Sequence, residues 1–330
     1  MTAGPQHPSW GDARREPWQG DGFGLVLRGS YPVIGIEEHA GPPPTDVTEL
    51  LLGTPTTAPL EGQRLREVRD NDGRLFMAID DHGELGLSVR APGWGMHHIS
   101  RDGRVVRSSP CELPAWRWQQ LLVGQVLPLI AVLRGHEVLH ASAVVRGGRA
   151  FALAGSSGAG KSTLAARLVL EGDGLLADDV LSVSLSNSGH PEAHRGSVTL
   201  SVRDNEGGLA TQLVGSGIAA TVGRDSKQHL LLRGAEQRLP LAAVYVLGQY
   251  GEGSGPIGAA TETAFFDLMG SSYIRYLRTQ ERLSSQLAVL SAVAQHCPIV
   301  PLNVGGGLTS AQLATELDAH IDEIAKARSR

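Results

Sequence analysis

The sequence predicts an α/β fold, in which a small β-rich domain precedes a larger domain with helices flanking a mixed sheet. The chain of 330 residues is long enough for two domains, and 41% apolar with 19% charged residues is typical of a globular protein. Short strand-like runs separated by glycine turns fill the first third. Further along, apolar strand-like runs alternate with helical patterns around one glycine-rich loop.

Composition also limits the kinds of partner. A net charge of −5 argues against a general binder of nucleic acid or of anionic membranes. The two cysteines, Cys111 and Cys297, provide neither a disulfide framework nor a metal-binding spacing, which indicates a reducing compartment. Residues 1–18 are polar and lack the apolar core of a signal peptide. We expect a cytoplasmic protein with no nucleic-acid or membrane partner, and a homo-oligomer stays open.

The N-terminal third divides into an arm and a domain. Residues 1–22 contain charges, prolines and glycines but almost no aliphatic side chains, so we expect a disordered arm. Residues 23–113 are expected to form the small β-rich domain, serving substrate recognition or oligomer contacts. Glycine turns at 72–73, 82–83 and 102–103 favour a meander. The expected strands are 23–27, 31–36, 75–79, 85–89 and 96–99.

A helical pattern follows at residues 116–133, with a broad apolar face and a kink expected at Pro128. Prolines at 110 and 114 indicate a boundary, so the helix is expected to open the second domain, residues 114–330.

Residues 155–162 match the phosphate-binding pattern G-x-x-x-x-G-K-[ST] completely. An apolar run at 151–154 precedes the loop and a helical pattern at 163–170 follows it. Glycines let backbone N–H groups face a phosphate, Lys161 adds a point charge, and the Ser162 hydroxyl can ligate Mg²⁺. We therefore expect ATP and Mg²⁺ as cofactors. The expected nucleotide-binding residues are Gly155, Ser156, Ser157, Gly158, Ala159, Gly160, Lys161, Ser162 and Thr163.

Two further features lie close to this loop. His140 opens an apolar run that turns through Gly147-Gly148 into the strand before the loop, which indicates an antiparallel hairpin. Downstream, the apolar run 175–177 ends in Asp178-Asp179. Two carboxylates near a phosphate site can divide two tasks, since one can hold Mg²⁺ while the other accepts a proton from the attacking hydroxyl.

At these residues the sequence resembles the catalytic domain of the HPr kinase/phosphorylase family, and more closely its relatives that include kinases of lasso-peptide precursors. The shared pattern is a histidine-led strand, a hairpin, the loop with a leucine-rich helix, and L-x-A-D-D-x-x-x-V, over about half the chain from 116 to 317. The resemblance implies a P-loop kinase domain of the HPr kinase type. It also implies that Asp178 is the general base, that Asp179 and Ser162 hold Mg²⁺, and that His140 lies beside the aspartate pair. With Lys161, Asp178 and His140 form the expected catalytic set.

The chain departs from the bifunctional members of that family at three places. Thr163 stands where they have glutamate, and Val180 stands where they have arginine. Their E-I-R-G-type segment has its nearest counterpart here in residues 194–198, which lack the acidic residue. We therefore expect a kinase without phosphorylase activity.

The expected activity is transfer of the γ-phosphate of ATP to a hydroxyl, on a serine of a peptide or protein such as a lasso-peptide precursor. A nucleotide-binding regulatory module and a small-molecule kinase stay open as alternatives. Retention of both aspartates favours an enzyme, because a binding module needs at most the metal carboxylate. The loop and the aspartates recognise the phosphate and leave the acceptor undefined.

The remaining sequence predicts further elements and two groups of cations. Lys227 precedes an expected strand, where a solvated lysine is commoner than one that reaches a phosphate. Arg275, Arg278 and Arg282 recur at helical spacing and form either a solvated face or a contact for an acidic peptide or phosphate. Residues 184–196 are expected to be polar and turn-rich. Strands are expected at 197–202, 230–232, 241–247 and 299–302, and helices at 209–214, 261–270, 273–296 and 310–327.

Overall fold

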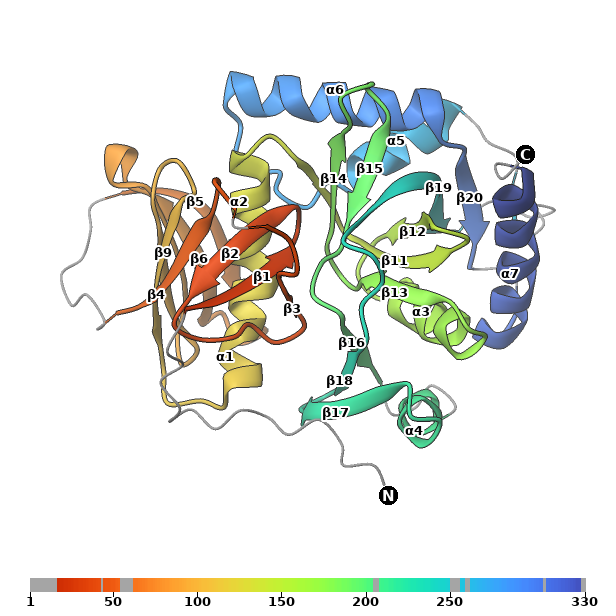
Figure 1. Cartoon of the computed structure of the whole chain (residues 1–330), viewed down its shortest axis with the longest axis horizontal. Helices are drawn as coiled ribbons and strands as arrows, with labels where there is room; N and C mark the ends of the chain where they lie inside the picture. The colour runs from red at the N-terminus through yellow and green to blue at the C-terminus, as the bar shows by residue number, and fades with distance from the viewer. Residues whose placement is uncertain are drawn as a thin grey trace.

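The protein is described here from a computed structural model, which covers residues 17–42, 44–53, 62–203, 208–249, 256–258, 262–304 and 307–327. A nine-stranded sheet on one side of the molecule and an eight-stranded sheet on the other are the two main layers (Figure 1). No helix in the described ranges is both long and apolar enough to cross a membrane.

The nine-stranded sheet has the order β3-β1-β2-β4-β9-β8-β7-β6-β5. Its second half is the expected antiparallel meander, β5 to β9, with left-handed glycines at the three expected turns, Gly73, Gly83 and Gly103. The strands are β1 Trp18–Gly22, β2 Leu25–Gly29, β3 Glu37–Glu38, β4 Thr48–Leu52, β5 Gln63–Arg69, β6 Leu75–Asp81, β7 Leu87–Ala91, β8 Gly95–Ile99 and β9 Val105–Pro110, with a 3₁₀ turn at Gly83–Leu85.

Two expectations for this region need correction. The arm expected at 1–22 is ordered at its end, because Trp18–Gly22 forms strand β1 and the indole of Trp18 is buried; residues 1–16 lie outside the described residues. Residues 31–36 form no strand, although Tyr31, Val33 and Ile36 are buried. The alternation in that segment therefore reports burial and not strand pairing.

The helix expected at 116–133 consists of α1 Ala115–Leu121, a π-helical turn Leu122–Val126, and α2 Leu127–Leu133. Pro128 lies in the first turn of α2, directly after the π turn, where its missing N–H breaks the regular ladder. The fully buried side chains of Leu122, Leu129 and Ile130 share one core with the nine-stranded sheet. The helix was expected to open the second domain, but it packs against the first sheet (Figure 1).

The eight-stranded sheet is mixed, with the order β10-β14-β15-β19-β12-β11-β13 and β20 beside β19. Strands β12, β19 and β20 run parallel, and β11 joins β12 through the expected Gly147-Gly148 hairpin. Its strands are β10 Glu137–Leu139, β11 Ala141–Arg146, β12 Arg149–Gly155, β13 Gly174–Ala177, β14 Leu181–Leu185, β15 Pro191–His194, β19 Arg238–Gly248 and β20 Ile299–Asn303. Strand β15 lies in the segment expected to be only polar and turn-rich.

Helices cover both faces of this sheet, as expected. Alternate residues of β12 face opposite cores: Phe151 and Leu153 pack with α3 and α7, whereas Ala152 and Ala154 pack with α5 and α6. These helices are α3 Lys161–Leu170, α5 Glu262–Gly270, α6 Gln280–His296 and α7 Ser310–Ala327. Helix α6 begins later than the expected residue 273, because the Thr279 hydroxyl caps it by accepting from the Arg282 N–H at 3.3 Å.

A small three-stranded sheet, with the order β16-β18-β17, completes the fold. It consists of β16 Thr199–Val202, β17 Ala219–Arg224 and β18 Gln228–Leu232, next to helix α4 Leu209–Gly215. The indole of Trp116 on α1 lies against Gly223 of β17, where an added Cβ would come within 2.3 Å of the ring. This sheet therefore joins the two larger parts close to the end of β13.

Candidate active site

The strand and the helix expected on either side of the glycine-rich loop are present as β12 and α3. Gly155, Gly158 and Gly160 have φ of 146°, 81° and 97°, which side chains with a Cβ rarely adopt. No side chain caps the N-terminus of α3, and a Cβ added at Gly158 or Gly160 would meet nothing within 4 Å. The loop therefore curves around open space, and the uncapped N–H groups at the N-terminus of α3 border that space. This arrangement is typical of a phosphate-binding site.

Lys161 is buried at the start of α3, with 6% of its surface exposed. Its ammonium group donates to the carbonyl oxygens of Gly155 at 3.0 Å and Ser156 at 2.9 Å. Nε2 of His140 lies 3.0 Å away. Burial lowers the pKa of Lys161, and the negative charges of Asp179 and Asp178 oppose that shift. The cation is thus fixed without a direct carboxylate bond and can attract an incoming anion.

His140 connects Lys161 to the aspartate pair. Its Nδ1 lies 3.0 Å from the backbone oxygen of Asp179, so Nδ1 carries the proton and donates it. Nε2 is then the acceptor for the Lys161 ammonium group. The imidazole also stacks on Tyr273, with ring centroids 5.8 Å apart. These contacts fix the ring orientation.

Asp178 is held by three donors. Its Oδ1 accepts from the hydroxyls of Ser142 at 2.6 Å and Ser162 at 2.8 Å, and its Oδ2 accepts from the Ser201 N–H at 3.1 Å. Burial raises the pKa of Asp178, the Ser142 bond opposes this, and the charge of Asp179 adds to it. Asp178, and not Asp179, is therefore the carboxylate in contact with the loop serine.

Asp179 has a different environment, although it is the next residue. Its φ of 69° is left-handed, a conformation that aspartate tolerates better than most residues. Its side chain is 60% exposed and lies 3.3 Å from Nδ1 of His140. Asp179 is the residue that lines all three of the cavities that meet at this point.

Two of the cavities flank the glycine-rich loop. The phosphate cavity, of about 100 Å³, contains Lys161, Ser162, Thr163 and two further cations, Arg203 and Lys227. Lys227 is therefore placed where it can reach a phosphate, the less common of the two roles considered for it. The large cavity, of about 800 Å³, shares His140, Ser157 and Asp179 with the phosphate cavity. It also contains Arg66, Gln249, Phe266, Asp267, Ser271, Ser272, Tyr273 and Arg275.

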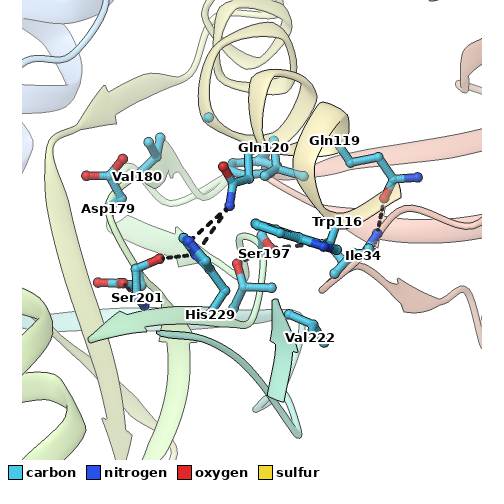
Figure 2. Close-up of a pocket in the computed structure, with 15 residues that line it drawn as sticks. Ile34, Trp116, Gln119, Gln120, Asp179, Val180, Ser197, Ser201, Val222 and His229 are labelled. Carbon is cyan, nitrogen blue, oxygen red and sulfur yellow. Dashed lines mark hydrogen bonds between the residues drawn. The ribbon is translucent and has the colours of Figure 1, made fainter. Parts of the chain in front are cut away.

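The third, inner cavity, of about 200 Å³, is lined by Asp178 among others. It lies between α1 and the small sheet (Figure 2). Figure 2 shows His229 between Gln120 and Ser201; Nδ1 of His229 lies 3.0 Å from the Ser201 hydroxyl, and the Gln120 amide nitrogen 3.3 Å away. Trp116 covers the imidazole at a centroid distance of 5.2 Å. Because its polar groups bond one another, this cavity offers fewer free contacts to a ligand.

The arginines expected on one helical face are separated in the structure. Arg282 is buried and pairs with Glu137 at 2.7 Å, Arg278 is exposed, and Arg275 lies before α6 and lines the large cavity. In the segment compared with E-I-R-G, Arg195 is buried and bonds Glu37 and the Ala235 carbonyl, both at 2.7 Å. Neither Arg282 nor Arg195 is available to a substrate.

Sequence reasoning missed several residues at the site. Ser142 lies two residues after His140, near the start of the expected hairpin strand, and this proximity is a signal that could have identified it. Ser201, Arg203 and Arg66 gave no comparable signal, because tertiary packing brings them in from the small sheet and the first sheet.

The residues present fit a magnesium–nucleotide complex. The Ser162 hydroxyl and the Asp178 carboxylate are 2.8 Å apart beside the N-terminus of α3, and both are hard oxygen ligands. Among the described residues, no three His, Cys, Asp or Glu side chains gather to form a metal cage. Mg²⁺ needs none, since it commonly binds one or two carboxylates together with substrate phosphates.

Comparison with protein-family models finds no match, and comparison with curated proteins finds none either. Among solved structures the chain is similar to the HPr(Ser) kinase/phosphatase from Coxiella burnetii, with 12% sequence identity and a TM-score of 0.31. The match covers 57% of this chain and 98% of that chain.

Proposed function

We propose that the protein is an ATP- and Mg²⁺-dependent kinase that transfers the γ-phosphate to a hydroxyl group. One observation supports this most strongly: the buried Lys161 ammonium group, the Ser162–Asp178 pair and the exposed Asp179 adjoin one open glycine loop. Phosphoryl transfer needs cations at the phosphates and a carboxylate at the attacking oxygen. This arrangement provides both.

In this proposal Ser162 and Asp178 hold Mg²⁺, which supplies charge neutralisation at the phosphate oxygens. Lys161 and the N–H groups at the start of α3 bind the phosphates. The acceptor hydroxyl transfers its proton to Asp179 as its oxygen forms the new bond to phosphorus. The bond between the γ-phosphorus and the bridging oxygen breaks, and ADP leaves.

These roles exchange the two aspartates relative to the family resemblance, which implies Asp178 as the base and Asp179 as the metal ligand. Three donors already occupy Asp178, one of them the Ser162 hydroxyl. Asp179 is largely exposed and borders the large cavity, where an acceptor can enter. A base must reach the proton that it removes, and this favours Asp179.

For the acceptor we propose a serine of a peptide or protein, such as a lasso-peptide precursor. We also propose that the protein transfers phosphate from ATP but does not catalyse the reverse reaction, phosphorolysis. Thr163 and Val180 stand where the bifunctional members of the resembled family have glutamate and arginine, and Arg195, in the segment compared with E-I-R-G, is engaged with Glu37.

The experiment compares wild-type protein with Lys161→Ala, using transfer of labelled γ-phosphate from ATP to a mixture of serine peptides and calorimetry of Mg·ATP binding. Losing the charge at the phosphates should reduce transfer by roughly 10²-fold or more. Lys326→Ala, on the exposed end of α7, is the matched control and should behave like wild type. Transfer that persists in Lys161→Ala would exclude the loop as the active site.

A further inference from the structure

The cations around the site form two separate groups. Lys161, Arg203 and Lys227 line the phosphate cavity, whereas Arg66 and Arg275 line the large cavity and not the phosphate cavity. The phosphates of a nucleotide account for the first group. The second group lies outside the phosphate cavity, on the side of Asp179 where an acceptor would enter in the proposed function, and is placed to bind a different anion.

Arg66 is held in position for such a contact. It comes from β5, which forms an edge of the first sheet, and its guanidinium lies over the Tyr276 ring at 5.7 Å. The charge of Asp179 raises the pKa of Tyr273, and the charge of Arg66 lowers it. Arg66 therefore lies within electrostatic reach of a side chain that Asp179 also affects. Stacking on an aromatic ring preorganises a guanidinium, which reduces the entropy lost when it binds a ligand.

Neither arginine is neutralised by an ion pair within the described part of the chain. On the same strand, Arg64 pairs with Asp80 and Glu67, and Arg69 pairs with Glu67. The large cavity contains two acidic residues, Asp267 and the proposed base Asp179. The two guanidiniums share this cavity with two carboxylates, but neither guanidinium is paired with one in the described part of the chain, so both keep donors that can bind an anionic ligand.

We propose that the large cavity is the acceptor site, and that Arg66 and Arg275 bind a carboxylate carried by the acceptor close to its hydroxyl group. This inference rests on the proposed function and deepens it. A volume of about 800 Å³ accommodates a peptide segment, and guanidinium groups bind carboxylates in bidentate geometry. The carboxylate is either an acidic side chain next to the serine or the C-terminus of a peptide that ends in serine. The first sheet thereby contributes a specificity residue.

The test measures kcat/KM for four synthetic serine peptides: one with aspartate beside the serine and an amidated end, one ending in serine with a free carboxylate, the amidated form of the second, and one flanked by lysine. A peptide with a carboxylate should be preferred, and which of the two is preferred identifies its source. Arg66→Gln should lower kcat/KM for that peptide by about 10-fold or more, because a charge-assisted bond is lost. The kcat/KM for the amidated form of the serine-ending peptide should not change, and neither should the Kd of Mg·ATP.

Two further variants separate binding from stability. Arg66→Lys keeps the charge but not the planar fork, so it should recover part of the loss. Arg278→Gln, exposed and outside the cavity lining, is the matched control and should keep the wild-type preference.

Several results would overturn the inference. One is a wild-type enzyme whose kcat/KM for the amidated serine-ending peptide, or for the lysine peptide, equals its kcat/KM for the peptides with carboxylates. Another is an Arg66→Gln variant that lowers all rates equally or weakens Mg·ATP binding. If no peptide is phosphorylated while Mg·ATP binding still depends on Lys161, the carboxylate-bearing peptide is rejected as acceptor and the nucleotide site is not. Absence of Mg·ATP binding in wild-type protein rejects the proposed function itself.

Discussion

At the scale of single residues, His140 connects the two charged groups on which the site depends. One ring nitrogen faces the Asp179 backbone oxygen at 3.0 Å and the other faces the Lys161 ammonium group at 3.0 Å. The proposed phosphoryl transfer assigns no proton transfer to the imidazole. His140 is therefore a positioning residue, which fixes where the base and the cation stand relative to each other.

Replacing His140 should consequently lower kcat by about 10-fold, as expected for the loss of ordering hydrogen bonds. His140→Ala should leave the KM for ATP nearly unchanged, and His140→Gln, which keeps a donor and an acceptor, should recover part of the rate. Steady-state kinetics of the two variants measure this. A loss in His140→Ala as large as that in Asp179→Asn, with no recovery in His140→Gln, would show that the imidazole takes part in the chemistry.

The sequence predicts which residues surround the glycine-rich loop more directly than it predicts the role of each aspartate. Lys161 and Ser162 follow from a local backbone motif, so their positions could be predicted. Adjacent aspartates look equivalent in sequence, whereas in the structure Asp178 contacts Ser162 and Asp179 has a left-handed φ and an exposed side chain. Ser201 reaches Asp178 through tertiary packing, which no local pattern encodes.

At the scale of elements, the conformation of the glycine-rich loop depends on positions that only glycine occupies without strain. Gly158 has φ of 81°, and a Cβ there would meet no protein atom within 4 Å. Gly189, in the turn between β14 and β15, has φ of 80° and an equally empty surrounding. The two positions therefore differ mainly in what their open space can hold.

This pair allows a controlled substitution. Gly158→Ala and Gly189→Ala should each destabilise the fold by roughly 1 kcal/mol, because both place a Cβ in left-handed backbone. Only Gly158→Ala should also weaken Mg·ATP binding, since its methyl group enters the phosphate cavity. Urea unfolding and calorimetry of both proteins provide the comparison, and equal nucleotide affinity in the two variants would place the phosphates elsewhere.

Elements with strong local signals were predicted correctly, and those set by packing were not. The hairpin at Gly147-Gly148 and the terminal helix α7 lie where their turns and periodicity indicate. The helix at 116–133 has a clear apolar face, but periodicity does not reveal which sheet that face contacts. Strand β15 was missed because partners on both sides stabilise a sequence with little apolar character.

At the scale of the whole molecule, a pair of histidines, one buried and one half-buried, lies where the first sheet meets the second. His136 and His194 stack at a centroid distance of 4.8 Å, and the turn at Gly24 approaches so closely that a Cβ there would lie 2.2 Å from the His136 ring. Burial lowers the pKa of His136 to about 4 and that of His194 to about 3. The two parts of the molecule thus meet at imidazoles that resist protonation.

This contact should make the fold sensitive to acid. An unfolded histidine titrates near 6.5, so between that pH and the folded pKa the unfolded state binds more protons and stability falls as pH falls. We expect a loss on the order of 1 to 2 kcal/mol per histidine between pH 7 and pH 5. Urea unfolding should show that the free energy of unfolding falls less between pH 7 and pH 5 in the double variant His136→Gln/His194→Gln than in wild type. Equal losses in the two proteins would contradict a contribution from this pair.

The separate roles of the two aspartates are central to the proposed function, and one set of measurements tests them. Initial rates and calorimetry of Mg·ATP binding are compared for wild type, Asp178→Asn and Asp179→Asn. Asp179→Asn should retain nucleotide affinity and lose turnover by roughly 10²-fold or more, because an amide cannot take the proton. Asp178→Asn should weaken Mg·ATP binding and raise the Mg²⁺ requirement, since a neutral amide holds a hard dication poorly. The reverse pattern would contradict the division of roles, and normal turnover in both variants would contradict the kinase proposal.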